Sequence, residues 1–199
     1  GWDVSAFYLY GWDKFPVPYR TITGGVYNFA PQYRRAHRLG GSFSKALGDV
    51  VLKGELLASP HAALATLDAT DADGVVERTT VDTLLGADYT LFGTLETNVQ
   101  LLQRIVGGHT SLLFNEDSTR THLSFWLKTS LLDGKVEPEL LFITRLAEQD
   151  ILLRPKLTAK LTNALQLKVG ADLFRGEPSG LFGRFDKHSR LYTELTYHF

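Results

Sequence analysis

A strict alternation of apolar and polar residues recurs along most of the chain and restricts the fold more than any other feature. In residues 95–101, apolar or small side chains occupy every second position, with acidic or amide side chains between them. A period of two places successive side chains on opposite faces of a β-strand. The pattern predicts about ten strands, at residues 2–10, 39–47, 52–58, 81–91, 95–101, 121–131, 136–142, 151–161, 165–173 and 191–199.

The connections between these strands alternate in length. Short turns are predicted at Gly48-Asp49, Phe92-Gly93, Asp133-Gly134 and Asn163-Ala164, and Asp-Gly favours a two-residue hairpin. Longer polar segments cover residues 11–32, 59–78, 107–120, 147–150 and 175–189; only residues 61–67 allow a helical turn or two. Short turns at one end and long loops at the other are typical of outer-membrane barrels.

The composition excludes several classes of protein. No stretch approaches 18 consecutive apolar residues, so no helix can span a membrane, whereas a barrel strand needs only about 9–11 residues. The net charge of −1 argues against a nucleic-acid partner, and the absence of cysteine removes disulfides and thiolate sites. The chain has no signal peptide and no methionine, so we expect either a removed leader or a piece of a longer chain.

The apolar positions of the predicted strands contain a single charged residue, Lys45, beside a turn from which its long stem can reach the interface. A Lys or Arg that faces lipid at mid-depth costs about 2–4 kcal/mol, which would remove charges from such a face. The opposite positions mix charges of both signs with bulky side chains, as a barrel lumen does. The candidates for lining that lumen are Glu96, Lys128, Glu137, Glu139, Arg154, Lys156, Lys160, Lys168, Asp172 and Glu194.

Aromatic residues gather near the predicted strand ends. They resemble the two girdles of membrane barrels, although aromatic residues also favour strands in general. The residues concerned are Tyr8, Tyr10, Tyr89, Phe92, Phe142, Phe174, Tyr192, Tyr197 and Phe199.

The last strand carries the most specific motif. Apolar or aromatic residues stand at every second position before the terminal Phe199, among them Leu195 and Tyr197. This strand resembles the C-terminal signature of bacterial outer-membrane proteins, and the whole chain resembles the C-terminal portion of large porin-like barrels of proteobacteria. The resemblance implies an integral outer-membrane location, insertion by the barrel-assembly machinery with these three residues as its signal, and contact with outer-membrane lipids and lipopolysaccharide.

We therefore expect an all-β, antiparallel, up-and-down transmembrane β-barrel in one domain. The sequence leaves open whether about ten strands close by themselves or continue a longer barrel. Pro138 and Pro155 should lie at strand ends or bulges, because proline cannot donate to the hydrogen-bond ladder.

Chemical motifs are weak, so we expect neither an enzyme nor a cofactor or metal. His122 and Ser124 share one strand face and resemble the pair of outer-membrane lipid A deacylases, but no acidic partner stands near on that strand. The acidic segments 115–118 and 68–74 offer oxygen ligands for a divalent cation, without the spacing of an EF-hand loop.

A channel for small solutes is the function that these features favour. Rows of opposed charge would set a field across a pore, or alternatively form ion pairs that stabilise its wall. A non-transporting anchor or adhesin is the alternative, because Trp126, Leu141, Phe174 and Tyr192 can fill a narrow lumen. A lipid-modifying enzyme is a lesser alternative, and the sequence does not identify the solute.

Overall fold

The computed structural model describes all residues of the chain, 1–199. They form twelve β-strands and one short 3₁₀ helix. The strands are β1 (Trp2–Trp12), β2 (Val17–Thr23), β3 (Val26–Gln32), β4 (Arg35–Leu47), β5 (Val50–Ala65), β6 (Val75–Leu91), β7 (Leu95–Val106), β8 (Thr119–Lys128), β9 (Val136–Arg145), β10 (Asp150–Lys160), β11 (Leu165–Gly176) and β12 (Arg190–Tyr197), and the 3₁₀ helix is η1 (Gly183–His188).

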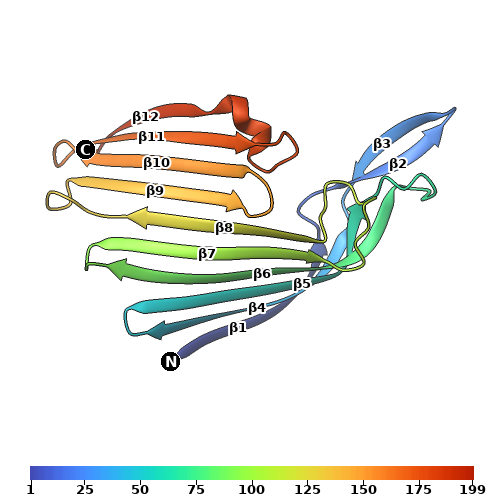
Figure 1. The fold of residues 1–199 in the computed structure, drawn as a ribbon, viewed down its shortest axis with the longest axis horizontal. Helices are drawn as coiled ribbons and strands as arrows, with labels where there is room; N and C mark the ends of the chain where they lie inside the picture. Colours follow the sequence, from blue (N-terminus) through green and yellow to red (C-terminus); the bar gives the residue numbers. More distant parts are fainter.

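Ten of the strands form one antiparallel sheet in the order β1-β4-β5-β6-β7-β8-β9-β10-β11-β12. Each strand pairs with the next strand along the chain, apart from the separate β2–β3 hairpin inserted between β1 and β4. Figure 1 shows the short turns and both chain ends at one end of the sheet, and the long connections at the other. The predicted all-β, up-and-down arrangement of ten strands is therefore confirmed. The sheet is open, because β1 and β12 each pair with a single neighbour.

Two predicted loops contain strand structure that the sequence analysis did not foresee. Segment 11–32 forms the hairpin β2–β3, which projects beyond the loop end of the sheet (Figure 1). The helical interpretation of residues 61–67 is wrong, because β5 runs on to Ala65. Its pairing with β6 shifts between Ser59 and Ala62, where His61 has a φ of 57°. This bulge interrupts the alternation, which explains why the pattern could not be followed through it.

The turns differ in size. Gly48-Asp49 is a two-residue turn, since Leu47 pairs directly with Val50. Asp133-Gly134 lies instead in a four-residue turn that is closed by hydrogen bonds between Leu131 and Val136, so the two-residue hairpin prediction is wrong there. Residues 132–134 all have positive φ, a conformation that only the glycine adopts without strain.

The two prolines behave differently. Pro138 is the third residue of β9, as the end-position prediction requires. Pro155 lies inside β10, where the prediction of an end or bulge is wrong, because the register with β11 is the same on both sides of it. The pairing with β11 is interrupted at residues 154–155, which accommodates a residue that has no N–H.

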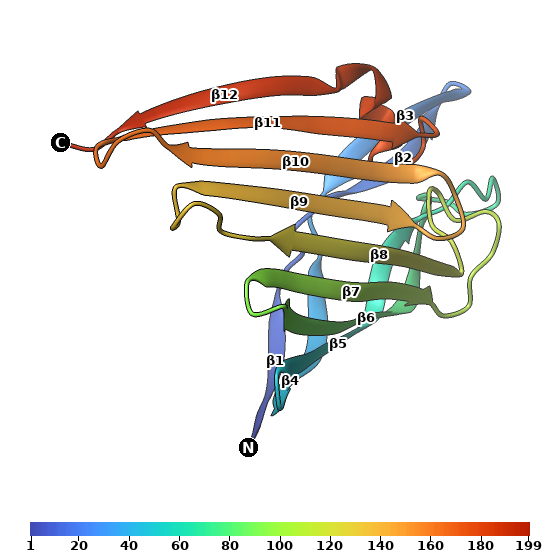
Figure 2. The same cartoon turned by 60° about the vertical axis from the view of Figure 1, so that its left-hand side comes forward.

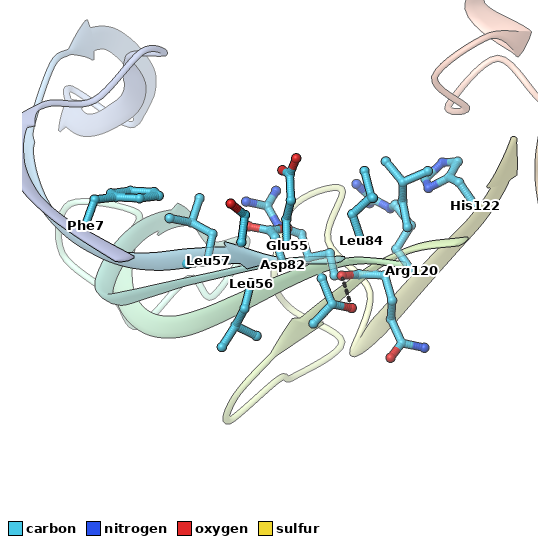
Figure 3. A pocket seen from close by; sticks show the side chains of 14 residues that line it. Phe7, Glu55, Leu56, Leu57, Asp82, Leu84, Arg120 and His122 are labelled. Carbon is cyan, nitrogen blue, oxygen red and sulfur yellow. Dashed lines mark hydrogen bonds and ion pairs between the residues drawn. The ribbon is translucent and has the colours of Figure 1, made fainter. Parts of the chain in front are cut away.

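The strand register brings the predicted apolar positions that lie within the ten strands to one face, while Thr129, Leu131, Leu161 and Phe199 fall just beyond the strand ends. Leu85 of β6 pairs with Leu101 of β7, and Leu101 pairs with Leu123 of β8. The same holds across the remaining strands. The sheet curls, with β1 and β4 steeply inclined to β8–β12 (Figure 2). The polar face is on the concave side of this curl and the apolar face is convex, as the opposite directions of Leu57 and Leu56 show (Figure 3).

No layer covers the convex apolar face, and the chain has almost no core. Only five apolar residues are buried, namely Ala36, Val106, Leu113, Leu152 and Ala171. Large apolar side chains on the convex face are widely exposed, for example Leu101 at 39% and Leu85 at 56%. The 3₁₀ helix is too short and too polar to cross a membrane.

Charged residues on the convex face lie only at its borders. The strands extend further at the loop end than predicted, and the added residues place Arg35, Glu77 and Arg175 on this face at its loop-end border. The predicted Lys45 lies at the opposite border, near the turns. The one amide between these borders, Gln103 toward the loop end of β7, donates a hydrogen bond of 3.1 Å to Thr121 on the next strand. The face between its two borders thus carries no charge and no unpaired amide.

Arg20 attaches the β2–β3 hairpin to the loop between β5 and β6. Its guanidinium donates hydrogen bonds to the carbonyl oxygens of Asp68 (2.7 Å) and Asp71, and its backbone N–H to Asp73 (2.7 Å). In the same loop, hydrogen bonds from Thr70 hold the pKa of Asp68 below its ordinary value. In the acidic segment 68–74, which offered oxygen ligands for a divalent cation, the carbonyl groups of Asp68 and Asp71 thus bind the guanidinium of Arg20.

Replacing Arg20 by alanine should release this hairpin. Two charge-assisted hydrogen bonds are lost, so we expect docking to weaken by about 3 kcal/mol. Limited chymotrypsin digestion should then cut at Tyr19 or Tyr27 much faster than in the parent chain. Arg175→Ala, which removes an exposed arginine of β11 that makes no ion pair, is the matched control and should leave the cleavage rate nearly unchanged.

Candidate functional site: the concave polar face

All ten predicted lumen-lining residues lie on the concave face of the sheet. Register pairs connect them directly, such as Glu96 with Lys128, Lys128 with Glu139 and Glu139 with Lys156. Lys168 likewise pairs with Glu194 across β11 and β12. The alternation thus predicted correctly which side chains share a face.

Nine of these ten residues form ion pairs with one another. Lys156 contacts Glu139 at 2.6 Å, and Lys168 contacts Glu194 at 2.7 Å. The remaining contacts are Lys128–Glu137 at 3.4 Å, Lys160–Glu137 at 3.7 Å and Arg154–Asp172 at 2.5 Å. The predicted ion pairs between the opposed rows are therefore present, and the field that these rows would set across a pore stays a prediction. Glu96 is the exception and has no ionic partner.

Asp172 is the most buried member of this network. Its side chain is 2% exposed and accepts hydrogen bonds from Arg154 and from Arg190 at 2.7 Å. The negative charge of this carboxylate offsets the positive charges of both guanidinium groups, but burying the carboxylate costs desolvation energy.

Replacing Asp172 by alanine should leave two facing arginines without a counter-charge. We expect a loss of about 1–2 kcal/mol in the free energy of unfolding, because two charge-assisted hydrogen bonds are lost while the guanidiniums, at 42% and 69% exposure, stay hydrated. Denaturant titration of the folded chain measures this loss. The double variant with Arg154→Met added should recover part of the stability, and a cost below that of an exposed pair would contradict the assigned role.

The two kinds of cation occupy different halves of the face. Arginines stand toward the loop end, where Arg104 pairs with Asp82 at 3.0 Å and Arg120 pairs with Asp117 at 3.2 Å. Lysines stand toward the turn end, where Lys53 contacts Asp88. The planar guanidinium can hold two carboxylates at once. Arg104 also reaches Glu116 and Arg145 binds Asp117 and Glu148, so arginines tie the 107–118 and 146–149 loops to the sheet.

The β11–β12 connection folds inward onto the concave face. Asp150, at 1% exposure, accepts backbone hydrogen bonds from Leu181 (2.8 Å), Phe182 (2.9 Å) and Gly183 (2.8 Å). Phe174, also on the concave face, packs against Phe185 of η1 with ring centroids 5.5 Å apart and the ring planes tilted by 49°. These contacts hold η1 across the loop end of the polar face, where it narrows the space above the sheet.

A hollow of about 610 Å³ lies on the concave side of β1, β4, β5, β6, β7 and β8. Figure 3 shows Phe7, Leu57, Leu84 and His122 pointing into this side, together with Glu55. Apolar side chains therefore interrupt the otherwise charged face at this position.

The weak chemical motifs of the sequence make few side-chain contacts with one another. His122 and Ser124 share the concave face of β8 as predicted, but no hydrogen bond joins them, and His122 pairs in register with Arg145. Glu116 and Asp117 of the acidic loop bind arginines. No group of three His, Asp or Glu side chains is arranged to hold a metal ion.

Several residues of the site were missed by sequence reasoning. Arg104, Arg120 and Arg145 follow the polar phase of their strands, but they lie at or beyond the predicted ends, so continuing the alternation would have found them. Asp150 gave no signal, and Asp117 was noted only as a possible cation ligand in segment 115–118, because their roles depend on how loops fold over the sheet.

The aromatic residues divide between the two faces. Tyr8, Tyr10, Tyr89, Phe142 and Tyr197 lie on the convex face by register, whereas Phe174 and Tyr192 lie on the concave face, which corrects their placement in a girdle. Leu195 and Tyr197 of the terminal motif are also on the convex face, 64% and 65% exposed, and Phe199 follows the strand.

Comparison with known proteins gives no relative: no protein-family model and no curated protein matches this chain. The similarity to porin-like barrels therefore rests on the residues of the chain alone, and no family is assigned.

Proposed function

We propose that this sheet forms the wall of a transmembrane β-barrel in the outer membrane of a Gram-negative bacterium, and that small solutes cross through its lumen. The observation that carries the proposal is the convex face. It is apolar over ten strands, it has charges only at its borders, and nothing covers it.

Water is a poor solvent for such a surface. In a water-soluble β-sandwich, these side chains would pack against a second sheet. Here they have no second layer, and five buried apolar residues cannot offset the conformational entropy lost on folding. Hydrocarbon chains of a bilayer would supply the missing apolar contacts. Trp2 and Trp12, at opposite ends of β1 on this face, suit the two interfaces of a membrane.

The two open edges set a requirement. Backbone N–H and C=O groups cannot stay unpaired in hydrocarbon, so β1 and β12 must pair with each other or with further strands. The proposal includes either form of closure. It also includes insertion by the barrel-assembly machinery through the terminal motif, and lipopolysaccharide around the loop end.

The concave face suits a solvated lumen. Its charges compensate one another in cross-strand pairs, which lowers the cost of placing them around a narrow passage. The inward position of η1 suits a constriction at the loop end.

Conductance in planar lipid bilayers tests passage. The protein, purified from outer membranes and reconstituted at low concentration, should give discrete current steps with weak charge selectivity, because most lumen charges are paired. Protein denatured before reconstitution is the control. Absence of steps at any voltage, from folded and inserted protein, would contradict a channel.

A non-transporting anchor is the second candidate, and one observation favours it. Bulky side chains, including Trp126 and Tyr192, share the concave face with the ion-pair network, and together they can fill a narrow barrel. Insertion without conductance would select this candidate over the channel.

A further inference from the structure

One row of side chains on the concave face differs from the rest of that face. Cross-strand register places Glu55 of β5 beside Leu84 of β6, Leu84 beside Leu102 of β7, and Leu102 beside His122 of β8. All four line the 610 Å³ hollow. Adjacent strands lie about 4.8 Å apart, so the row extends over about 14 Å.

The middle of this row is apolar. Leu84 and Leu102 form its floor, and Phe7 and Leu57 line the same hollow toward β1. The ring of Phe7 lies over Gly40, which has no side chain to displace it. Figure 3 shows Phe7, Leu57 and Leu84 directed to the same side. Binding of an apolar solute would remove this apolar surface from water, which is favourable in free energy.

The two ends of the row carry the groups that the ion-pair network leaves free. Arg104 and Arg120, which also line the hollow, are already paired with Asp82 and Asp117. Glu55, by contrast, has no ionic or hydrogen-bond partner, although it points into the concave side (Figure 3).

His122 also makes no side-chain hydrogen bond. Its Nε2 atom is enclosed, so Nδ1 is the ring nitrogen that a solute can reach. A carboxylate accepts hydrogen bonds, and an imidazole can donate or accept one.

From this arrangement we infer that the row binds a small, uncharged, apolar solute with a hydrogen-bonding group at each end. A hydroxyl donates to Glu55, the apolar body lies on Leu84 and Leu102 beside Phe7, and the second group bonds the imidazole of His122. The length of the row suits two linked six-membered rings. The inference deepens the proposed passage of solutes and rests on it, because it names the class of solute that the lumen selects.

Equilibrium binding tests the inference with 4,4′-dihydroxybiphenyl as the probe. The folded full chain in detergent is titrated in a calorimeter, and biphenyl-4,4′-dicarboxylate, with the same body, is the matched ligand. We expect saturable binding of the diol and at least tenfold weaker binding of the dicarboxylate, whose charge opposes Glu55. Equal binding of both compounds, or only non-saturable uptake, would overturn the inference.

Matched variants separate specific binding from partition into detergent. Glu55→Gln should weaken diol binding about tenfold, since a hydrogen bond to a charged group is lost. Glu96→Gln, an unpaired acid at the turn end of the same face, should leave it unchanged. Leu84→Asn should also weaken binding, whereas Leu141→Asn on the same face should not. Unchanged affinity in both Glu55→Gln and Leu84→Asn would overturn the site.

Conductance distinguishes the two proposals. Steady conductance without saturable diol binding would contradict the binding site and support the channel. Saturable, Glu55-dependent binding without conductance would support the binding site and contradict the channel.

Discussion

Replacing Leu101 by arginine is expected to lower the stability of the bilayer-inserted protein by about 2–4 kcal/mol. Leu101 lies midway along β7 on the convex face, where a guanidinium would meet hydrocarbon. Urea titration of the protein folded into lipid vesicles measures the free energy of unfolding. The fraction that folds into vesicles in the first place should fall as well.

Two other positions on β7 provide controls. Gln100→Arg places the same group on the concave face and should cost little. Leu95→Arg places it on the convex face at the turn end, where the cost should be about 0–1 kcal/mol, because a charge near the interface stays hydrated. A cost that does not depend on depth would indicate an ordinary protein core and would contradict the membrane proposal.

Replacing Asp150 by alanine is expected to detach the inward-folded β11–β12 connection. Three backbone N–H groups would lose their acceptor, and each unsatisfied group costs about 1–3 kcal/mol. A connection that is no longer held should be cut by trypsin at Arg184 far faster than in the parent protein. If the protein conducts, the current should also become larger or noisier, because η1 no longer narrows the loop end.

Asp49→Ala, in an exposed turn at the opposite end, is the control for a general effect of removing an acid. Asp150→Asn keeps one carbonyl acceptor and should give an intermediate rate of cleavage. If Asp150→Ala leaves the rate of cleavage unchanged, the carboxylate does not hold this connection.

The alternation of residues predicted most of the sheet. A one-residue slip in register would exchange the two faces of a strand, yet every predicted apolar position that lies within a strand is on the convex face. The apolar phase of the strands contains almost no charge between its borders, so the pattern is nearly free of exceptions. Lys45 was recognised as an exception and does lie at a strand end.

The errors occur where conformation depends on more than the local pattern. The bulge at His61 and the turn at residues 132–135 both require positive φ at non-glycine residues, which alternation cannot reveal. The hairpin β2–β3 is held by Arg20, whose partners are about 50 residues away. Pro155 was misplaced because the sheet tolerates a local gap in its ladder.

For the candidate site, the sequence predicted which side chains share a face but not which of them are in contact. The shared face of Glu139 and Lys156 follows from the period of two, but their direct contact at 2.6 Å needs the register between β9 and β10. Asp150 and Asp117 act through folded loops, and no periodic signal marks them. The contrast between paired charges and the unpaired Glu55 is likewise visible only in three dimensions.

The membrane proposal depends on whether the convex face meets lipid or water, and spin labelling measures this directly. The chain has no cysteine, so single cysteines introduced at residues 95–104 can each be labelled without background. In lipid vesicles, labels at odd positions should be accessible to oxygen dissolved in the hydrocarbon, and labels at even positions to a water-soluble nickel complex. If both sets respond only to the nickel complex, or the odd set is shielded from both reagents, the convex face does not meet lipid.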